Sequence, residues 1–182
     1  MNDSRVSVVD EILRLFKGRG DSAYGREAAS QREHALQAAH LAREAGSPPT
    51  LVVATLLHDV GHMLHDLPDD APDHGVDDRH EELAARFGPD VAKPARLHVQ
   101  AKRFLCADEP GYLDRLSEPS RISMRLQGGP MSPEEAERFR SSPHAAAALV
   151  LRRCDDSAKS PGLVVPGVED YIPWIERALI RS

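Results

Sequence analysis

LVVATLLHDVGH, residues 51–62, is an apolar run that leads into an adjacent histidine and aspartate. Successive side chains of a helix point about 100° apart, so His58 and Asp59 can both reach a metal ion that lies beside the helix axis. A carboxylate that emerges from a buried helix is costly unless a cation or hydrogen bonds compensate its charge. The stretch therefore predicts a buried helix that carries two metal ligands.

Candidate partners for this pair lie on two other predicted helices. His34 lies upstream, in the segment 30–46. Asp155 extends the apolar stripe formed by Ala148 and Leu151, so its side chain should point inward. A lone histidine on an apolar face is more often a core residue than a ligand. The dispersed pattern of one histidine, the HD pair and a distant aspartate nevertheless resembles the HD superfamily, whose members bind a metal with these four side chains.

Two more histidines, His80 and His98, lie on predicted helices between the HD pair and Asp155. A site for one metal needs neither, and the alternative is that both are ordinary helix residues. Together they would bind a second ion while Asp59 bridges, an arrangement that holds two cations about 3.5–4 Å apart. Protein ligands would then fill nearly all coordination positions of one metal, and the other metal would keep positions open for substrate. The predicted ligands are His34, His58, Asp59, His80, His98 and Asp155.

The composition is that of one globular domain. The chain has 182 residues, and we expect a single domain over 1–182 in which residues 1–20 form a peripheral N-terminal helix. The net charge of −6 disfavours nucleic acid as a partner, because phosphate backbones require a basic surface. Without a long apolar run or a signal-peptide core, we expect a cytoplasmic location and no membrane partner. The two cysteines are too isolated for a disulfide framework and are expected to pack in the interior.

Helical periodicity dominates the chain, and no useful β-alternation occurs. Ser30 and Glu33 form the pattern of a capping box at the start of the second helix. Loops are predicted at 21–30 and 67–75, and irregular structure with short helical turns at 108–133. The predicted fold is an all-α HD-domain helical bundle, with helices at 6–16, 30–46, 47–67, 77–87, 90–105, 133–140, 144–158 and 168–180.

Imidazole and carboxylate ligands without thiolate suit iron, manganese or zinc, so the ligands alone leave the reaction open. One possible class is hydrolysis of a nucleotide or phosphomonoester, the commoner activity of HD proteins, which proceeds without O2. The other is oxygen chemistry at a di-iron pair. A metal-containing regulatory or binding module is a third alternative, and the six placed ligands disfavour it.

Several blocks of sequence sharpen this choice. They are YGREAASQREHALQAAHLAREAG at 24–46, VVATLLHDVGH at 52–62, HVQAKRFL at 98–105, LSEPS at 116–120, LQGGPMSPEEAE at 126–137 and RRCDDSAK at 152–159. With them the chain resembles the HD-domain mixed-valent di-iron oxygenases that cleave organophosphonates. The resemblance implies two iron ions, as Fe2+/Fe3+, with O2 and a small organophosphonate as substrates. It implies cleavage of the C–P bond of a 1-hydroxy-2-aminoethylphosphonate, or of its N-methylated or trimethylammonio analogue, to phosphate and glycine or glycine betaine.

The resemblance also implies roles for residues beside the metal ligands. Tyr24 would block the open iron until substrate arrives, and Glu27 would meet the cationic nitrogen of the substrate. His62, one turn after His58, fits a further donor to the substrate or to the metal ligands. Lys102, one turn after His98, would place an ammonium group near the open iron, which suits a phosphonate. Further candidates for phosphonate contacts are Ser120, Ser123 and Gln127.

Each of these assignments has a plainer alternative. A tyrosine and a glutamate are ordinary residues of an exposed loop, so Tyr24 and Glu27 need not touch a ligand. The spacing of Lys102 is equally compatible with a surface position on its helix. Ser120 and Ser123 are residue types that commonly cap helices or stabilise turns.

Overall fold

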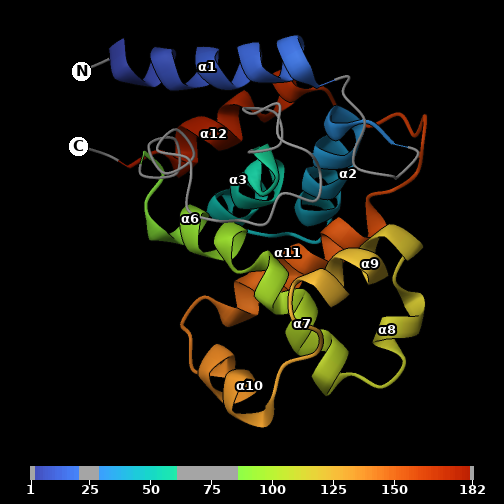
Figure 1. Cartoon of the computed structure of the whole chain (residues 1–182). Helices are drawn as coiled ribbons and strands as arrows, with labels where there is room; N and C mark the ends of the chain where they lie inside the picture. The colour runs from blue at the N-terminus through green and yellow to red at the C-terminus, as the bar shows by residue number, and fades with distance from the viewer. Residues whose placement is uncertain (1–2, 21–28, 61–85, 181–182) are drawn as a thin grey trace.

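The computed structural model describes residues 3–20, 29–60 and 86–180, and all regular elements in these ranges are helices (Figure 1). The predicted all-α class is thereby confirmed. None of the described helices is long and apolar enough to cross a membrane. The elements are α1 Asp3–Arg19, α2 Gln31–Glu44, α3 Pro49–Leu57, α6 Pro89–Arg96, α7 His98–Asp108, α8 Tyr112–Arg115, α9 Glu118–Leu126, α10 Pro133–Arg140, α11 Ala145–Ser157, η1 Val168–Tyr171 and α12 Ile172–Ala178.

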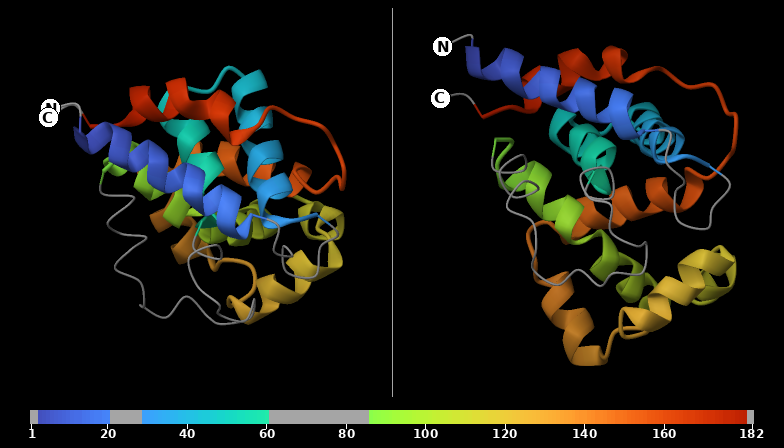
Figure 2. Two further views of the ribbon diagram at one scale, coloured as in Figure 1. Left: turned by 90° about the horizontal axis from the view of Figure 1, so that it is seen from above. Right: turned by 45° about the horizontal axis from the view of Figure 1, so that its top comes forward.

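α3 is the central helix of the main core. Every residue from Leu51 to Leu57 is buried, because this apolar run offers no polar face to water. α2, α6, α11 and α12 pack around α3, and α1 lies outside them against α12 and η1 (Figures 1 and 2). The central position of α3 brings its C-cap residue, His58, into the interior of the molecule.

A second apolar cluster lies below α11 in the view of Figure 1 and joins α7, α8 and α10. In it, the rings of Phe104 and Phe139 lie 5.0 Å apart between centroids. α11 contributes to both clusters, since Leu151 is buried in the main core and Ala148 in the second. Because α11 is packed on both sides, its position is fixed, and Asp155 near its C-terminal end is buried.

Capping residues determine where two of the helices begin. At α2, the hydroxyl of Ser30 accepts a hydrogen bond from the amide of Glu33 at 3.2 Å, and Oε2 of Glu33 accepts one from the amide of Ser30 at 2.8 Å. The predicted capping box is therefore confirmed. Ser132 and Glu135 make the same two bonds at α10, whose bounds agree with the predicted helix 133–140. Such bonds satisfy amides that a helix start leaves unpaired.

The predicted helix 90–105 is two helices, α6 and α7, which meet at Leu97. Two local features oppose a continuous helix. Pro94 has no amide hydrogen to donate, and its ring crowds the preceding turn. The imidazole of His98 donates to the carbonyl oxygen of Ala95 at 2.6 Å and so competes with backbone pairing. The prediction of a single helix was wrong, and the break makes His98 the first residue of α7.

Other predicted boundaries lie outside the described residues or differ from the structure. α3 ends at Leu57, and residues 61–85, where the predicted helix 47–67 continues and the helix 77–87 begins, lie outside the described part of the chain. Most of the predicted loop 21–30 lies outside it too. The segment 108–133 is more regular than predicted, because it contains the nine-residue helix α9, whose N-cap Ser117 accepts from the amide of Ser120 at 3.3 Å.

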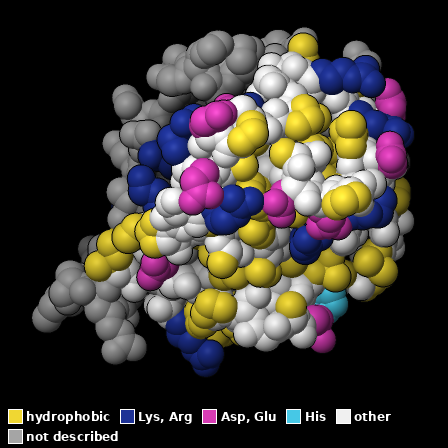
Figure 3. All heavy atoms as spheres, turned by 90° about the horizontal axis from the view of Figure 1, so that it is seen from below, with side chains coloured by type: hydrophobic (Ala, Val, Ile, Leu, Met, Phe, Trp, Pro, Cys, Tyr) yellow, Lys and Arg dark blue, Asp and Glu magenta, His cyan; other side chains and the backbone are white. Residues whose placement is uncertain are grey.

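The face seen from below carries acidic, basic and apolar side chains that alternate over short distances (Figure 3). Exposed ion pairs occur on α10, at this end of the molecule. Arg140 lies 3.0 Å from Asp108 of α7 and 2.9 Å from Glu137. Solvent-exposed pairs of this kind contribute little to stability. The packing of this end therefore depends mainly on the second apolar cluster.

Candidate metal centre

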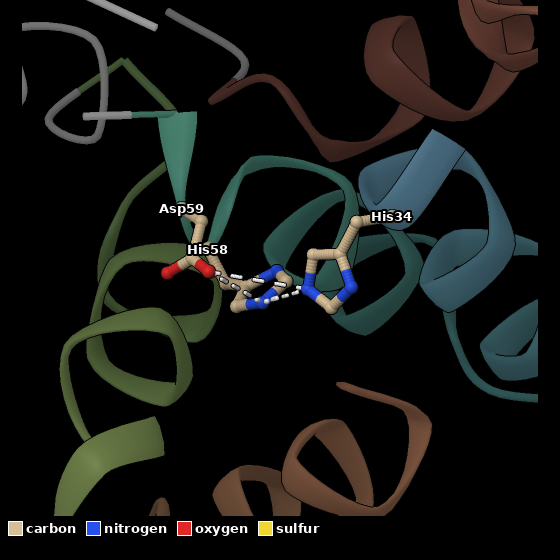
Figure 4. A group of neighbouring side chains, drawn as sticks. All are labelled: His34, His58 and Asp59. Carbon is tan, nitrogen blue, oxygen red and sulfur yellow. Dashed lines mark hydrogen bonds and ion pairs between the residues drawn. The ribbon is translucent and has the colours of Figure 1, made fainter. Parts of the chain in front are cut away.

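Three side chains from α2 and the end of α3 point toward one another (Figure 4). Nε2 of His34 and Nε2 of His58 lie 3.3 Å apart. Oδ2 of Asp59 lies 3.4 Å from Nε2 of His58 and 3.9 Å from Nε2 of His34. Donor atoms that bind one ion at about 2.0–2.2 Å lie about 3–4 Å from one another, so this spacing fits a metal. His34, His58 and Asp59 are therefore placed to hold a metal ion together.

Asp155 of α11 reaches the same point from the opposite side. Its Oδ1 lies 3.5 Å from Nε2 of His34, and its Oδ2 lies 3.8 Å from Nε2 of His58. The side chain is buried, and among the described residues neither carboxylate oxygen accepts a hydrogen bond. Oδ2 has an ion-pair partner in Nη1 of Arg152 at 2.7 Å, whereas a buried carboxylate oxygen without a hydrogen bond, such as Oδ1, is suited to a metal ion. The inward orientation predicted for Asp155 is confirmed.

His98 approaches Asp59 on its other side. Nε2 of His98 lies 3.4 Å from Oδ1 of Asp59, whereas Oδ2 of Asp59 faces His34 and His58. The rings of His58 and His98 are 5.3 Å apart between centroids and nearly perpendicular. The two oxygens of Asp59 therefore face different imidazoles. A carboxylate in this position can bridge two cations.

Backbone carbonyls hold the three imidazoles in one tautomer. In His34, Nδ1 donates to the carbonyl oxygen of Ala158 at 2.8 Å. In His58, Nδ1 donates to the carbonyl oxygen of Thr55 at 2.7 Å, and in His98 it donates to that of Ala95 at 2.6 Å. Since each Nδ1 carries the hydrogen, each Nε2 presents its lone pair to the centre. Two lone pairs that face each other at 3.3 Å, as in His34 and His58, repel unless a cation lies near them. The tautomers thus fit a metal site rather than a hydrogen-bond network.

The electrostatics of the centre favour the metal-binding forms. Burial lowers the pKa of His34 to about 4 and also lowers the pKa of His98, so both rings are neutral near pH 7. Burial alone would raise the pKa of Asp155. The positive charge of nearby Arg152 outweighs that effect and holds the pKa of Asp155 well below its usual range. The centre therefore offers neutral imidazoles together with an ionised carboxylate, the protonation states that a metal requires.

A cluster of lysine and serine side chains lies next to the centre. Nζ of Lys102 donates to the hydroxyl of Ser123 at 2.8 Å. Nζ of Lys159 donates to the hydroxyls of Ser120, at 2.7 Å, and Ser117, at 3.2 Å. Burial, followed by the charge of Arg152, lowers the pKa of Lys102 to about 8. Two ammonium groups and three hydroxyls in one cluster make an environment suited to an anion.

Sequence reasoning found part of this cluster and missed the rest. Lys102 is buried, as a site residue should be, and not on the surface of its helix. Lys159 was not singled out, although it follows Asp155 by four residues in the sequence, as Lys102 follows His98. That shared spacing was the available signal. Ser117 was missed as well, because its role as the N-cap of α9 is an ordinary one for serine.

Not every predicted site residue is in this assembly. Gln127, the C-cap residue of α9, is exposed, and its contact with a substrate stays a prediction. Four predicted residues lie outside the described part of the chain: Tyr24, Glu27, His62 and His80.

The fold and the clustered ligands define a helical metalloprotein of the HD type. A model of the HD domain matches residues 32–138. A hydroxymethylphosphonate dioxygenase of Gimesia maris is 41% identical over 180 residues, which cover 96% of this chain and 89% of that protein. The [1-hydroxy-2-(trimethylamino)ethyl]phosphonate dioxygenase (glycine-betaine-forming) of Leisingera caerulea is 37% identical over 179 residues, 96% of this chain and 91% of that protein.

An uncharacterised protein, L432 of Acanthamoeba polyphaga mimivirus, is 36% identical over 158 residues, 83% of this chain and 72% of that protein. The chain belongs to the HD-domain phosphonate dioxygenase family. The family expected from the sequence blocks is thereby confirmed, as is its assignment to the oxygenases.

Proposed function

We propose that the protein is a di-iron dioxygenase that cleaves the C–P bond of a small 1-hydroxyphosphonate. The names of both dioxygenase relatives support this substrate class, because hydroxymethylphosphonate and 1-hydroxy-2-(trimethylamino)ethylphosphonate each carry a hydroxyl on the carbon bonded to phosphorus. The proposed iron ligands are His34, His58, Asp59, His80, His98 and Asp155.

The position of Asp59 is the observation that carries this proposal. Its Oδ2 faces His34 and His58, while its Oδ1 lies 3.4 Å from Nε2 of His98. A single metal held by His34, His58 and Asp155 would use one oxygen of Asp59 and would not involve the imidazole of His98. A second ion beside the other oxygen of Asp59 and this imidazole accounts for both, and carboxylate bridges are typical of two-metal sites.

The lysine and serine cluster supplies the complementary binding site for the phosphonate. Lys102 lies one turn after the proposed ligand His98 on α7, and Lys159 follows the proposed ligand Asp155 just beyond the end of α11. Their ammonium groups can neutralise the phosphonate dianion, and the neighbouring serine hydroxyls can donate to its oxygens. This arrangement would direct the carbon that bears the hydroxyl toward the metal ligands.

The reaction balances without another reactant. One oxygen atom of O2 goes to carbon and the other to phosphorus, the C–P bond breaks, and a carboxylate and phosphate are released. Bound iron would supply the activation of O2 and the electron transfer that oxidation of the carbon requires. In our proposal Tyr24 covers the site before substrate binds, and His62 contributes a further donor.

The second substituent of the substrate distinguishes the two relatives' compounds, since hydroxymethylphosphonate has no cationic nitrogen. In our proposal Glu27 meets such a nitrogen when the substrate carries one. Replacement of Glu27 by glutamine should therefore raise the KM for an aminated substrate and leave the KM for hydroxymethylphosphonate nearly unchanged. A comparison of both substrates with both proteins would identify the preferred one.

Phosphate release in the presence and absence of O2 tests the function directly. Iron-loaded protein should release phosphate from a 1-hydroxyphosphonate and consume O2 in a one-to-one ratio. The same protein should be inactive under anaerobic conditions. Release of phosphate from phosphomonoesters without O2 would instead support the hydrolase alternative, and iron-loaded protein that turns over no 1-hydroxyphosphonate would contradict the proposal.

A further inference from the structure

Arg152 is a buried cation directly behind Asp155. Its side chain is 4% exposed, and its Nη1 lies 2.7 Å from Oδ2 of Asp155, one turn further along α11. The contact is an ion pair without hydrogen-bond alignment, because neither oxygen of Asp155 accepts a hydrogen bond from the described residues. Arg152 therefore balances the charge of Asp155 from the side of Oδ2, while Oδ1 accepts no hydrogen bond from the described residues.

Two other residues, Asp156 and Tyr112, bind the guanidinium of Arg152. Nη2 of Arg152 donates to Oδ1 of Asp156, and Nε donates to the hydroxyl of Tyr112 at 3.3 Å. That hydroxyl in turn donates to Oδ2 of Asp156. Tyr112 belongs to α8 and the other residues to α11. A planar guanidinium with fixed partners on one edge has little freedom to turn, so its other edge stays against Asp155.

We propose that Arg152 is a positioning residue for the metal centre. Anchored by Asp156 and Tyr112, it holds the carboxylate of Asp155 in its ligand orientation and places a fixed positive charge beside the bound iron. A nearby positive charge favours the reduced, less positive form of the metal, so Arg152 raises the reduction potential of the iron. This inference rests on the proposed di-iron function for the identity of the metal.

Stability alone is a poor reason for this arrangement. The cost of removing two charges from water offsets most of their attraction, so apolar residues of similar size often stabilise a core as well as an ion pair does. An apolar residue, however, carries no charge that could act on the metal. The neighbouring Arg153 shows the contrast, because it is exposed and donates to Glu109 at 2.6 Å on the surface.

Four variants separate the electrostatic role from a structural one. Arg152→Met removes the charge and keeps an apolar stem, Arg152→Lys keeps the charge, and Tyr112→Phe removes one anchor. Arg153→Met is the matched control on the same helix. For each protein we would measure the reduction potential of the bound iron in an EPR-monitored titration, the rate of metal loss to a chelator, and the unfolding temperature.

Arg152→Met should lower the reduction potential and speed metal loss by about 10- to 100-fold, the usual range for loss of a residue that supports a ligand. Arg152→Lys should restore part of the potential, Tyr112→Phe should shift it slightly downward, and Arg153→Met should match the wild type. Equal potentials and equal rates of metal loss in Arg152→Met and Arg153→Met would overturn the proposal, even if the unfolding temperatures differ.

If Arg152→Met does not fold, the two remaining variants decide the test. Reduction potentials and metal-loss rates equal to the wild type in both Arg152→Lys and Tyr112→Phe would overturn the proposal. A lower reduction potential in Tyr112→Phe would support it. Failure of the proposed function is a separate result, seen as wild-type protein that releases no phosphate. The chelator comparison, made with the metal that the protein retains, would still decide the role of Arg152.

Discussion

Nδ1 of His34 donates to the carbonyl oxygen of Ala158 at 2.8 Å, so a metal ligand on α2 holds the chain immediately before Lys159. Gln37, on the same helix, holds it immediately after. Its Nε2 donates to the carbonyl oxygen of Ser160 at 2.6 Å, and its Oε1 accepts from the Ser160 amide at 3.0 Å. α2 thus positions both a ligand of the metal centre and an ammonium group of the proposed phosphonate site.

Replacement of Gln37 by leucine preserves the approximate size of the side chain and removes both bonds to Ser160. We expect the free energy of unfolding to fall by about 1–3 kcal/mol, because polar backbone groups of Ser160 lose their partner. The KM for phosphonate should rise more than kcat falls, since Lys159 loses its support. Urea denaturation and steady-state kinetics measure these effects. Gln100→Leu on the exposed side of α7 is the control, and an unchanged KM in Gln37→Leu would contradict the positioning role.

Replacement of Lys102 or Lys159 by methionine removes one positive charge from the proposed phosphonate site. Hydrogen bonds to charged groups contribute about 1.5–3 kcal/mol, so each change should raise the KM by about 10- to 100-fold. Inhibition by inorganic phosphate should weaken in parallel, while the metal content stays the same. Lys93→Met, at an exposed position of α6, should leave all three quantities unchanged. Wild-type phosphate inhibition in both variants would place the anion elsewhere.

His98→Ala should reduce the bound metal from two ions to one per chain, because the proposed second ion loses an imidazole while the site around His34 and His58 stays intact. Turnover of 1-hydroxyphosphonate should be lost. Elemental analysis after gel filtration measures the stoichiometry. His144→Ala is a suitable control, since His144 is the N-cap residue of α11 and only its weak pairing with Asp90, at 4.0 Å, is lost. Retention of two ions in His98→Ala would exclude His98 as a ligand.

Tyr171 is fully buried, and among the described residues its hydroxyl has no hydrogen-bond partner. Burial raises its pKa from 10 to about 12. As the pH rises, Tyr171 therefore ionises in the unfolded state before it ionises in the folded state, and this favours unfolding. The contribution of neutral Tyr171 to the free energy of unfolding is complete below pH 10 and is lost as the pH rises from 10 through 12. This amounts to up to about 3 kcal/mol. Tyr171→Phe should reduce the alkaline loss of stability and change stability at pH 7 by less than about 1 kcal/mol, as measured by urea denaturation at each pH. An identical alkaline profile in the variant would contradict this assignment.

Local features of the chain could be predicted from the sequence without the structure. The apolar run before His58 predicted a buried helix, and the serine and glutamate spacing at 30 and 33 predicted the capping box that begins α2. The apolar stripe of α11 predicted that Asp155 points inward. Each of these inferences depends on residues within a few turns of one another, where sequence spacing and spatial proximity are nearly the same.

The boundary between α6 and α7 was not predicted, because helical periodicity continues through 90–105. A side chain that bonds to the backbone, His98 to Ala95, competes there with the helix, and periodicity contains no information about that competition. The same boundary bears on the site, since α7 starts at His98, whose Nε2 lies 3.4 Å from Oδ1 of Asp59.

The sequence by itself determined the metal ligands His34, His58 and Asp59, the inward position of Asp155 and, through its resemblance to a family, the class of enzyme. Only the tertiary structure decided that the two oxygens of Asp59 face different imidazoles and that Lys159 joins Ser120. It also decided that Arg152 stands behind Asp155 with Tyr112 as its anchor. These relationships join elements that are far apart in the chain. They arise from the packing of α11 between the two apolar clusters, and the pattern within one helix does not specify the helix against which it packs.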